Sequence, residues 1–227
     1  MGEPDLPIRW RDEHVLVVDK PAGLVVHPAR GHREGTLSQL LSGLAAGGEA
    51  ERAGIVHRLD RDTSGLMVVA RSERSHAKLQ AALRERLIER EYIALVEGVP
   101  PARTGTIEAP IGRHPRIRTR MAIDGVSPRE ARTHFELSEA IGGEYALLRL
   151  RLDTGRTHQI RVHLQAIGHP VCGDPEYGTP GLLGLRRQFL HATRLAFPHP
   201  LTGERIEVGS PLPEDLACAL ERARKRG

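Results

Sequence analysis

One stretch of the 227-residue chain reads His57-Arg58-Leu59-Asp60-Arg61-Asp62-Thr63-Ser64-Gly65 and runs directly into Leu66-Met67-Val68-Val69-Ala70. The apolar run has the length and composition of a buried strand, and turn-forming residues lead into it. The charged residues are therefore expected at the end of a rigid element, where their positions can be fixed. Two carboxylates lie here among three basic side chains, and nearby positive charge favours the ionised form. An ionised carboxylate suits a nucleophile or a general base better than a general acid. Spacing alone does not rank Asp60 against Asp62.

The composition is that of an ordinary globular protein, with 39% apolar and 27% charged residues. The length allows one sizeable core or two small ones. Only three of the 33 basic residues are lysines, and the net charge is +4. Arginine recognises phosphate and carboxylate well, and the positive charge favours an anionic partner such as nucleic acid. A high arginine content can also reflect genome composition.

The sequence shows no feature of a membrane or secreted protein. No apolar run approaches the ~18 residues of a membrane span, and residues 1–7 lack the basic-then-apolar pattern of a signal peptide. Cys172 and Cys218 form neither a disulfide framework nor a metal-ligand pair. We therefore expect a cytoplasmic protein with reduced thiols, and nothing in the sequence requires more than a monomer.

Several short strands and four helices are predicted along the chain, with no internal repeat. The predicted strands are 15–18, 66–70, 91–97, 131–137, 145–152, 191–197 and 205–208, and the helices begin at Thr36, at Ser72 or Ser75, at Thr157 and at Glu214. Because strands outnumber helices and often follow one another, the expected fold class is α+β. Its central sheet is mixed and mostly antiparallel, flanked by helices and loops. A single domain over residues 1–227 is expected, with a loose start over residues 1–9.

Residues 112–120 form a strongly basic segment, Gly-Arg-His-Pro-Arg-Ile-Arg-Thr-Arg. Its arginines are Arg113, Arg116, Arg118 and Arg120. The segment is predicted to be a loop. It is either a solvated run of charge or a projection that grips phosphates.

A second constellation reads Asp153-Thr154-Gly155-Arg156-Thr157-His158. A strand is expected to end here, a glycine to turn the chain, and a helix to begin at Thr157. Arg156 and the free amides of the helix start would then form an anion site. The anion could be a phosphate or a carboxylate such as Asp60. The alternative is a plain glycine turn with exposed basic residues.

Two other kinds of site are disfavoured. The Asp-Thr sequences at Asp62 and Asp153 resemble the loops of aspartic proteases, but those enzymes need two carboxylates that share one proton, and arginines here would ionise both. A metal site could be sought among His57, His158, His163, Asp174 and His191, but these residues lack a strong ligand motif. Tyr92, one of three tyrosines, could pack in the core or stack on a single flipped base.

Taken together, the motifs resemble the RluA/RluD-type family of RNA pseudouridine synthases. The motifs are Ala53 to Gly65, Lys20 to Leu24 with Val26-His27-Pro28, Arg90-Glu91-Tyr92, Thr154 to His163, Gly168-His169-Pro170, Gly173-Asp174-Pro175, Tyr177-Gly178 and Leu190-His191-Ala192. The likeness covers roughly residues 12–215 and is nearer the RluD branch. The small N-terminal RNA-binding domain of many such members is expected to be absent, and Asp19 replaces an asparagine common in relatives.

The resemblance implies the pseudouridine synthase fold and an isomerase that converts specific uridines in structured RNA to pseudouridine. Large-subunit ribosomal RNA is favoured over transfer RNA as the substrate, and neither a metal nor another cofactor is expected. Asp60 matches the family's catalytic aspartate, Arg156 the basic residue that pairs with it, and Tyr92 the tyrosine that packs on the uracil. RNA contacts are expected from His57, Arg58, Thr157, His158 and the four arginines of residues 112–120. Asp60 would attack or act as a base, at the ribose or at the uracil ring. The competing hypothesis is an inactive RNA-binding module of the same fold.

Overall fold

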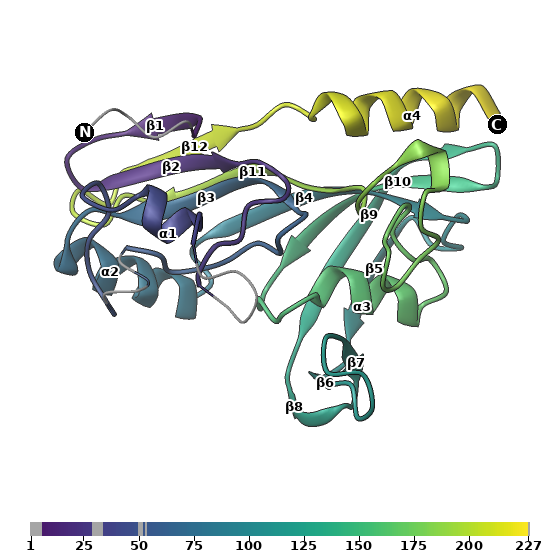
Figure 1. Cartoon of the computed structure of the whole chain (residues 1–227), viewed down its shortest axis with the longest axis horizontal. Helices are drawn as coiled ribbons and strands as arrows, with labels where there is room; N and C mark the ends of the chain where they lie inside the picture. The colour runs from purple at the N-terminus through teal and green to yellow at the C-terminus, as the bar shows by residue number, and fades with distance from the viewer. Residues whose placement is uncertain (1–5, 29–33, 50–51, 53, 227) are drawn as a thin grey trace. The chain divides into compact units, whose positions relative to one another are not determined.

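The computed structural model describes residues 6–28, 34–49, 52 and 54–226 (Figure 1). The chain divides into two compact units. Unit 1 comprises Met1–Arg90 and Ala192–Pro211, and unit 2 comprises Glu91–His191 and Leu212–Gly227. Strands β4 (Glu89–Glu97) and β11 (Leu190–Pro198) each have residues in both units. The units are described separately below, and the expected single catalytic domain stays a prediction.

The sheet of unit 1 is built from β1 (Ile8–Arg11), β2 (Val15–Lys20), β3 (Ser64–Ala70) and β11 in that order, with β12 (Arg205–Gly209) paired to β11. The pairings β1–β2, β2–β3 and β11–β12 are antiparallel. Every residue of β3 is buried, which explains its unbroken apolar sequence. The loose start was partly mispredicted, because residues 8 and 9 belong to strand β1, whose alternate residues are exposed. Residues 1–5 lie outside the described part.

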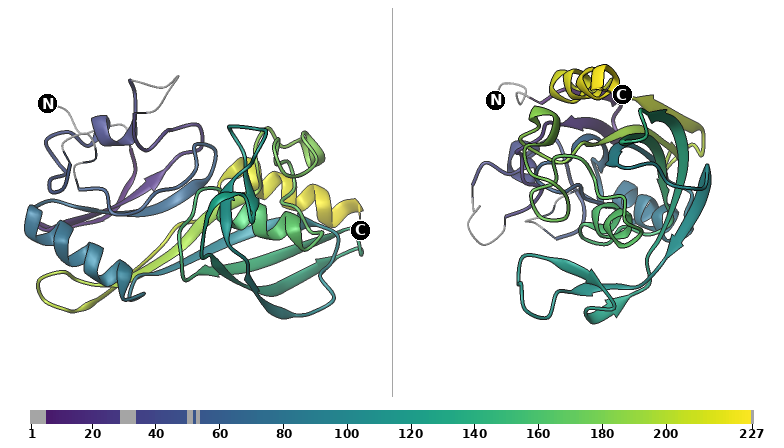
Figure 2. Two further views of the ribbon diagram at one scale, coloured as in Figure 1. Left: turned by 90° about the horizontal axis from the view of Figure 1, so that it is seen from below. Right: turned by 90° about the vertical axis from the view of Figure 1, so that its right-hand side faces the viewer.

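Helix α2 (Glu73–Arg84) covers one face of this sheet (Figures 1 and 2). The helix was predicted to begin at Ser72 or Ser75, and Ser72 is its N-cap, with Oγ accepting a hydrogen bond from the Ser75 amide at 3.2 Å. Leu79 and Ala82 pack with apolar residues of β2, β3, β11 and β12 in one core cluster. The helix predicted from Thr36 is much shorter than expected, because α1 spans only Leu37–Leu40 before a turn at Leu41.

In unit 2, the strands β4, β10 (Tyr145–Leu152), β9 (Arg132–Ile141) and β5 (Thr104–Glu108) follow one another in the sheet. Their pairings are antiparallel. Helices α3 (Gln159–Ala166) and α4 (Glu214–Arg226) and the short 3-10 helix η2 (Leu182–Gly184) complete the unit. The predicted α+β class, with a mostly antiparallel sheet, is confirmed.

A separate three-stranded sheet in unit 2 contains the basic segment. Strands β6 (Ile111–Arg113), β7 (Met121–Ile123) and β8 (Val126–Arg129) pair antiparallel in the order β7-β6-β8. We call residues 111–129 the finger, because they project beyond helix α3 (Figure 1 and the right view of Figure 2). The basic segment was predicted as a loop throughout, but its first residues are in β6, and only residues 114–120 form the connection to β7.

Gly65 closes the opening motif at a point where two main chains nearly touch. Its φ is +117°, and a Cβ added there would lie less than 3.0 Å from the main-chain N, C and O atoms of Ala192 in β11. An L side chain is therefore excluded both by the backbone conformation and by the neighbouring strand.

The motif is also attached to β3 by the ring of His57. The main-chain N–H of Val68 donates to His57 Nε2 at 3.1 Å, and the ring is buried, with 9% of its surface exposed. Burial, with a smaller contribution from the positive charge of Arg90, lowers the pKa of His57 to about 3. His57 is therefore a neutral hydrogen-bond acceptor at physiological pH.

We predict that Gly65→Ala destabilises unit 1 by about 3 kcal/mol or more, since strain and a main-chain clash combine. The control is Gly203→Ala, at φ +76° with nothing within 4 Å of the added Cβ. It should cost only about 1–2 kcal/mol of left-handed strain. Urea unfolding of both variants measures this, and equal losses would contradict the close packing of β3 on β11.

We also predict a pH-dependent contribution from His57. Its folded pKa of about 3 lies below the ordinary value of 6.5, so the unfolded chain binds a proton first as the pH falls. The contribution of neutral His57 to the free energy of unfolding is therefore fully present above pH 6.5. It is lost as the pH falls toward 3, by at most about 1.4 kcal/mol per pH unit. His57→Gln should lose less stability than the wild type between pH 7 and pH 4. A stability difference between the two proteins that does not change with pH would disprove this.

Candidate active site

Asp60 lies in a tight turn just before β3. The Thr63 amide donates to the Asp60 carbonyl at 3.2 Å, which places Arg61 and Asp62 at the corner of the turn. Leu59 is buried with 4% of its surface exposed, while Asp60 is half-buried. The buried leucine and the buried strand thus hold Asp60 in a fixed position in which it is only partly buried.

The other side of this turn is held by Lys20, whose side chain is fully buried. Its Nζ donates to the carbonyl oxygens of Pro21, Leu24 and Arg61 at 2.8, 2.9 and 2.9 Å. The Gly23 amide also donates to the Arg61 carbonyl, at 2.9 Å. The turn of residues 20–24 therefore supports the Asp60 turn directly. We did not predict this role for Lys20. The available signals were a lysine following an apolar strand and the place of Lys20 in the Lys20-to-Leu24 motif of the family resemblance.

Asp62 is bound by its neighbour. Arg61 Nε and Nη2 donate to the Asp62 carboxylate at distances between 2.8 and 3.1 Å. This local pair leaves Arg61 half exposed and Asp62 about one quarter exposed. Such a contact is typical of a turn residue, and it agrees with the assignment of the catalytic role to Asp60 on family grounds.

The surroundings of the Asp60 turn are positively charged. Arg58 is exposed and, among the residues that the structure describes, has no carboxylate within ion-pairing distance. Burial, followed by the charges of Arg52 and Arg58, lowers the pKa of His27 to about 4. Arg58 is therefore available to an anionic ligand. His57 supports the loop, as described above, and its expected RNA contact stays a prediction.

Tyr92 is in strand β4 of unit 2, opposite Leu150 of β10. Its ring is buried, with 5% of its surface exposed. The rigid sheet fixes this ring, which is a requirement for stacking on a base. Its expected contact with uracil stays a prediction.

Arg156 lies in a loop of unit 2 that is closed by Gln159. The Gln159 side-chain oxygen accepts hydrogen bonds from the Arg156 amide at 2.9 Å and from Thr154 Oγ1 at 2.8 Å. Arg156 Nε donates to the Glu130 carbonyl at 2.9 Å. Burial, followed by the charge of Arg129, lowers the pKa of Arg156, and the charge of Glu130 opposes this shift. The expected pair of Arg156 with Asp60 stays a prediction.

The start of the following helix differs from the prediction. Helix α3 begins at Gln159, and its N-cap is His158 in the left-handed region at φ 56°, so Thr157 does not cap it. The Arg156 amide is already bound by Gln159, and the expected set of free amides is correspondingly smaller. His158 Nδ1 shares a hydrogen bond of 2.9 Å with the Tyr177 hydroxyl. Neither Gln159 nor Tyr177 was predicted to shape this site.

The finger presents arginines that have no carboxylate partner. Arg113, Arg116 and Arg118 are exposed, and no ion pair to them is formed within the described part of the chain. The connection holds its own shape, since His114 Nδ1 accepts from the amides of Arg116 and Ile117 at 3.2 and 3.0 Å. Arg120 is less exposed and lies over the Tyr177 ring, with Cζ 5.5 Å from the ring centre.

The described residues include no group of three or more His, Cys, Asp or Glu side chains able to hold a metal ion. Members of the alternative metal cluster have other contacts: His163 bonds Thr133 Oγ1 and the Ala109 carbonyl, and Asp174 pairs with Arg161. Over the same residues, no helix is long and apolar enough to span a membrane.

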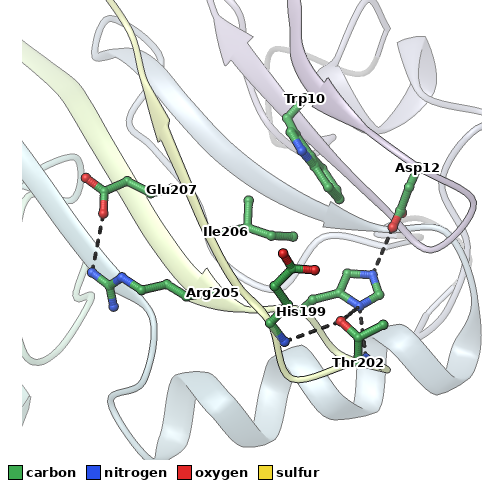
Figure 3. A pocket seen from close by; sticks show the side chains of 8 residues that line it. Trp10, Asp12, His199, Thr202, Arg205, Ile206 and Glu207 are labelled. Carbon is green, nitrogen blue, oxygen red and sulfur yellow. Dashed lines mark hydrogen bonds and ion pairs between the residues drawn. The ribbon is translucent and has the colours of Figure 1, made fainter.

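A pocket of about 340 Å³ in unit 1 lies beside Trp10 and the turn that joins β11 to β12 (Figure 3). At its base, His199 Nδ1 accepts from the Thr202 amide at 3.0 Å, and Nε2 lies 2.9 Å from Asp12 Oδ2. Burial raises the pKa of Asp12, but hydrogen bonds from the amides of Val15 and His14 and from His199 lower it overall. His199 thus contacts both Asp12 and the turn that joins β11 to β12.

Comparisons with known proteins agree with this description. A family model for RNA pseudouridylate synthase matches residues 14–166. The chain is 45% identical over 234 residues to the uncharacterized RNA pseudouridine synthase YlyB of Bacillus subtilis (strain 168), covering 100% of this chain and 76% of that protein. It is 46% identical over 228 residues to the ribosomal large subunit pseudouridine synthase D of Nitrosomonas europaea, covering 96% and 65%. The chain thus spans about two thirds to three quarters of these relatives.

Solved structures show the same likeness. The human RNA pseudouridylate synthase domain containing 4 matches with a TM-score of 0.75 and 27% identity, over 96% of this chain and 92% of that chain. The human RNA pseudouridylate synthase domain containing 1 matches with a TM-score of 0.72 and 30% identity, over 96% and 89%. The protein therefore belongs to the RluA/RluD-type family of RNA pseudouridine synthases.

Proposed function

We propose that the protein converts uridine to pseudouridine in RNA, with large-subunit ribosomal RNA as its substrate. Similar synthases from Nitrosomonas europaea and Pseudomonas aeruginosa are named for the large ribosomal subunit. The observation that carries the proposal is the Asp60 turn, held between Lys20 and β3 with Asp60 only partly buried. The proposal requires no second subunit, so we propose that the protein acts as a monomer. We also propose that it acts in the cytoplasm.

The reaction is an isomerisation, so substrate and product contain the same atoms and no co-substrate is consumed. The bond from ribose C1′ to uracil N1 breaks, the ring turns, and C1′ bonds to C5. C5 then loses its proton and N1 gains one, so the reaction balances. In the proposal Asp60 acts as nucleophile or base, at the ribose or the ring, and Arg156 keeps it ionised. Tyr92 packs on the uracil. Extrusion of the base from the helical stack is required before Asp60 can reach it.

RNA binding is assigned to basic and polar side chains of both units. Arg58 would contact the flipped nucleotide with His57, and Thr157 and His158 would contact RNA beside Arg156. The exposed arginines of the finger would bind phosphates, because guanidinium groups without carboxylate partners are free to pair with them. Support for this comes from the exposure of Arg113, Arg116 and Arg118.

One prediction from the proposed function concerns the two carboxylates, Asp60 and Asp62. Asp60→Ala should abolish pseudouridine formation, at least a 10³-fold loss, because it removes the reacting group. Asp62→Asn should retain most activity, because Asp62 pairs with Arg61 at the corner of the turn and the asparagine side-chain oxygen can still accept from Arg61. The measurement is tritium release from C5-labelled uridine in ribosomal RNA. An inactive wild type would favour an RNA-binding module instead. Equal loss in both variants would contradict the choice of Asp60 over Asp62.

Another prediction from the proposed function concerns the finger. Replacing Arg113, Arg116 and Arg118 by glutamine should weaken RNA binding. It should also make the negative slope of the logarithm of the RNA association constant against the logarithm of the salt concentration less steep by about 2–3, since each lost phosphate contact contributes about 0.7–0.9. RNA affinity measured between 50 and 200 mM salt tests this.

The matched control removes three exposed positive charges from helix α2, by replacing Arg74, Lys78 and Arg84 with glutamine. These side chains are exposed, and no RNA contact is assigned to them. The control should change the slope by less than 1. A finger variant whose slope equals that of the control would exclude the finger as a phosphate contact.

A further inference from the structure

The hydroxyl of Tyr177 lies between the finger and the start of helix α3. The main-chain N–H of Met121, the first residue of β7, donates to this oxygen at 2.8 Å. His158 Nδ1, at the N-cap of α3, shares a hydrogen bond with the same oxygen at 2.9 Å. One oxygen atom therefore connects residues 121 and 158, on two different elements of unit 2.

The main chain of Tyr177 is itself held firmly. Asp174 is fully buried, and its Oδ1 accepts hydrogen bonds from the amides of Glu176 and Tyr177 at 2.9 and 3.1 Å. The same carboxylate receives two hydrogen bonds from Arg161 of α3, at 2.6 and 2.9 Å. Removing one partner from a buried pair of this kind is strongly destabilising, so Tyr177 projects from a rigid base.

The ring of Tyr177 also packs against the finger. It forms one apolar cluster with Ile111 of β6, Ala131 and Val162, with Met121 and Ile123 of β7 packed against them. The Cζ atoms of Arg161 and Arg120 lie 4.8 and 5.5 Å from the ring centre. A phenylalanine would keep all of these contacts and lose only those of the hydroxyl.

The hydrogen-bonding capacity of the hydroxyl fits both partners. A tyrosine hydroxyl accepts from one donor and still has its own proton to donate. Burial raises the pKa of Tyr177 to about 12, so the hydroxyl keeps its proton at neutral pH. It can therefore accept from the Met121 amide and complete the hydrogen bond with His158 at the same time.

We infer that Tyr177 is a positioning residue for RNA binding, whose hydroxyl fastens strand β7 of the finger to His158 at the start of α3. The finger arginines are thereby held in a constant position relative to the loop that carries Arg156. This inference rests on the proposed function, because it assigns the finger a grip on RNA.

Tyr177→Phe tests the inference in the full chain. Removing the hydroxyl breaks its hydrogen bonds to Met121 and His158 and should raise KM for ribosomal RNA about fivefold, which corresponds to about 1 kcal/mol, while kcat stays within about twofold of the wild type. A purely structural residue would lower the active fraction, and so kcat, without changing KM. The Met121 amide should also exchange its hydrogen at least fivefold faster, because it loses its acceptor.

The matched control is Tyr145→Phe. Tyr145 is as buried as Tyr177, with 6% against 5% of the surface exposed, and within the described chain its hydroxyl makes no hydrogen bond. The control should leave both KM and the exchange of the Met121 amide within twofold of the wild type. A Tyr177→Phe variant that matches this control in KM or in Met121 exchange would overturn the inference.

The readouts separate this inference from the proposed function. If the wild type forms no pseudouridine and binds no RNA, the proposed function fails and the RNA-positioning role fails with it, whatever the exchange rate of Met121. If the wild type is active and the finger triple variant loses salt dependence, but Tyr177→Phe keeps the wild-type KM, only the positioning role fails. A raised KM together with faster Met121 exchange supports both.

Discussion

A single buried ammonium group fixes the turn on which the reacting carboxylate depends. A buried charge costs several kcal/mol unless its N–H groups find acceptors, and Lys20 finds them in the carbonyls of Pro21, Leu24 and Arg61. Any movement of Arg61 away from Lys20 would leave one donor unmet. Asp60 directly precedes Arg61, so its position is restrained by a residue that is 41 positions from Arg61 in sequence. Preorganisation of this kind is what a nucleophile or base requires.

The framework of the fold was largely readable from local pattern. Strand β3 was indicated by its continuous apolar run and β10 by its alternation. Their predicted limits, and the predicted starts of helices α2 and α4, agree with the structure to within a few residues. The strands that were missed are short or polar: β1 alternates partly exposed with exposed residues, and β8 is exposed throughout. Such strands exist because a neighbouring strand offers hydrogen bonds, and a single sequence does not show which neighbour will be present.

The sequence identified residues of the site only where the residue type alone determines the chemistry. Charge and turn signals indicated the Asp60 stretch, and the family likeness ranked Asp60 above Asp62. The contacts that shape the site connect distant residues, as in the bonds from Lys20 to Arg61 and from Tyr177 to Met121. The N-cap of helix α3 was predicted at Thr157, one residue before its observed position at His158. The reason is that the side chain of Gln159 closes the preceding loop in place of a capping threonine. Sequence spacing carries no signal for such closures.

The distribution of arginine partners bears on the two explanations of the arginine-rich composition. Several arginines of the framework are paired with carboxylates, among them Arg132, Arg187, Arg194 and Arg224. In the finger, the sequence has no acidic residue between Glu108 and Asp124, and Arg113, Arg116 and Arg118 remain exposed. Genome composition can raise the number of arginines, but it does not account for removing their partners from one hairpin. Unpaired charge concentrated on a projection attracts a polyanion far more strongly than a net charge of +4 spread over the surface would.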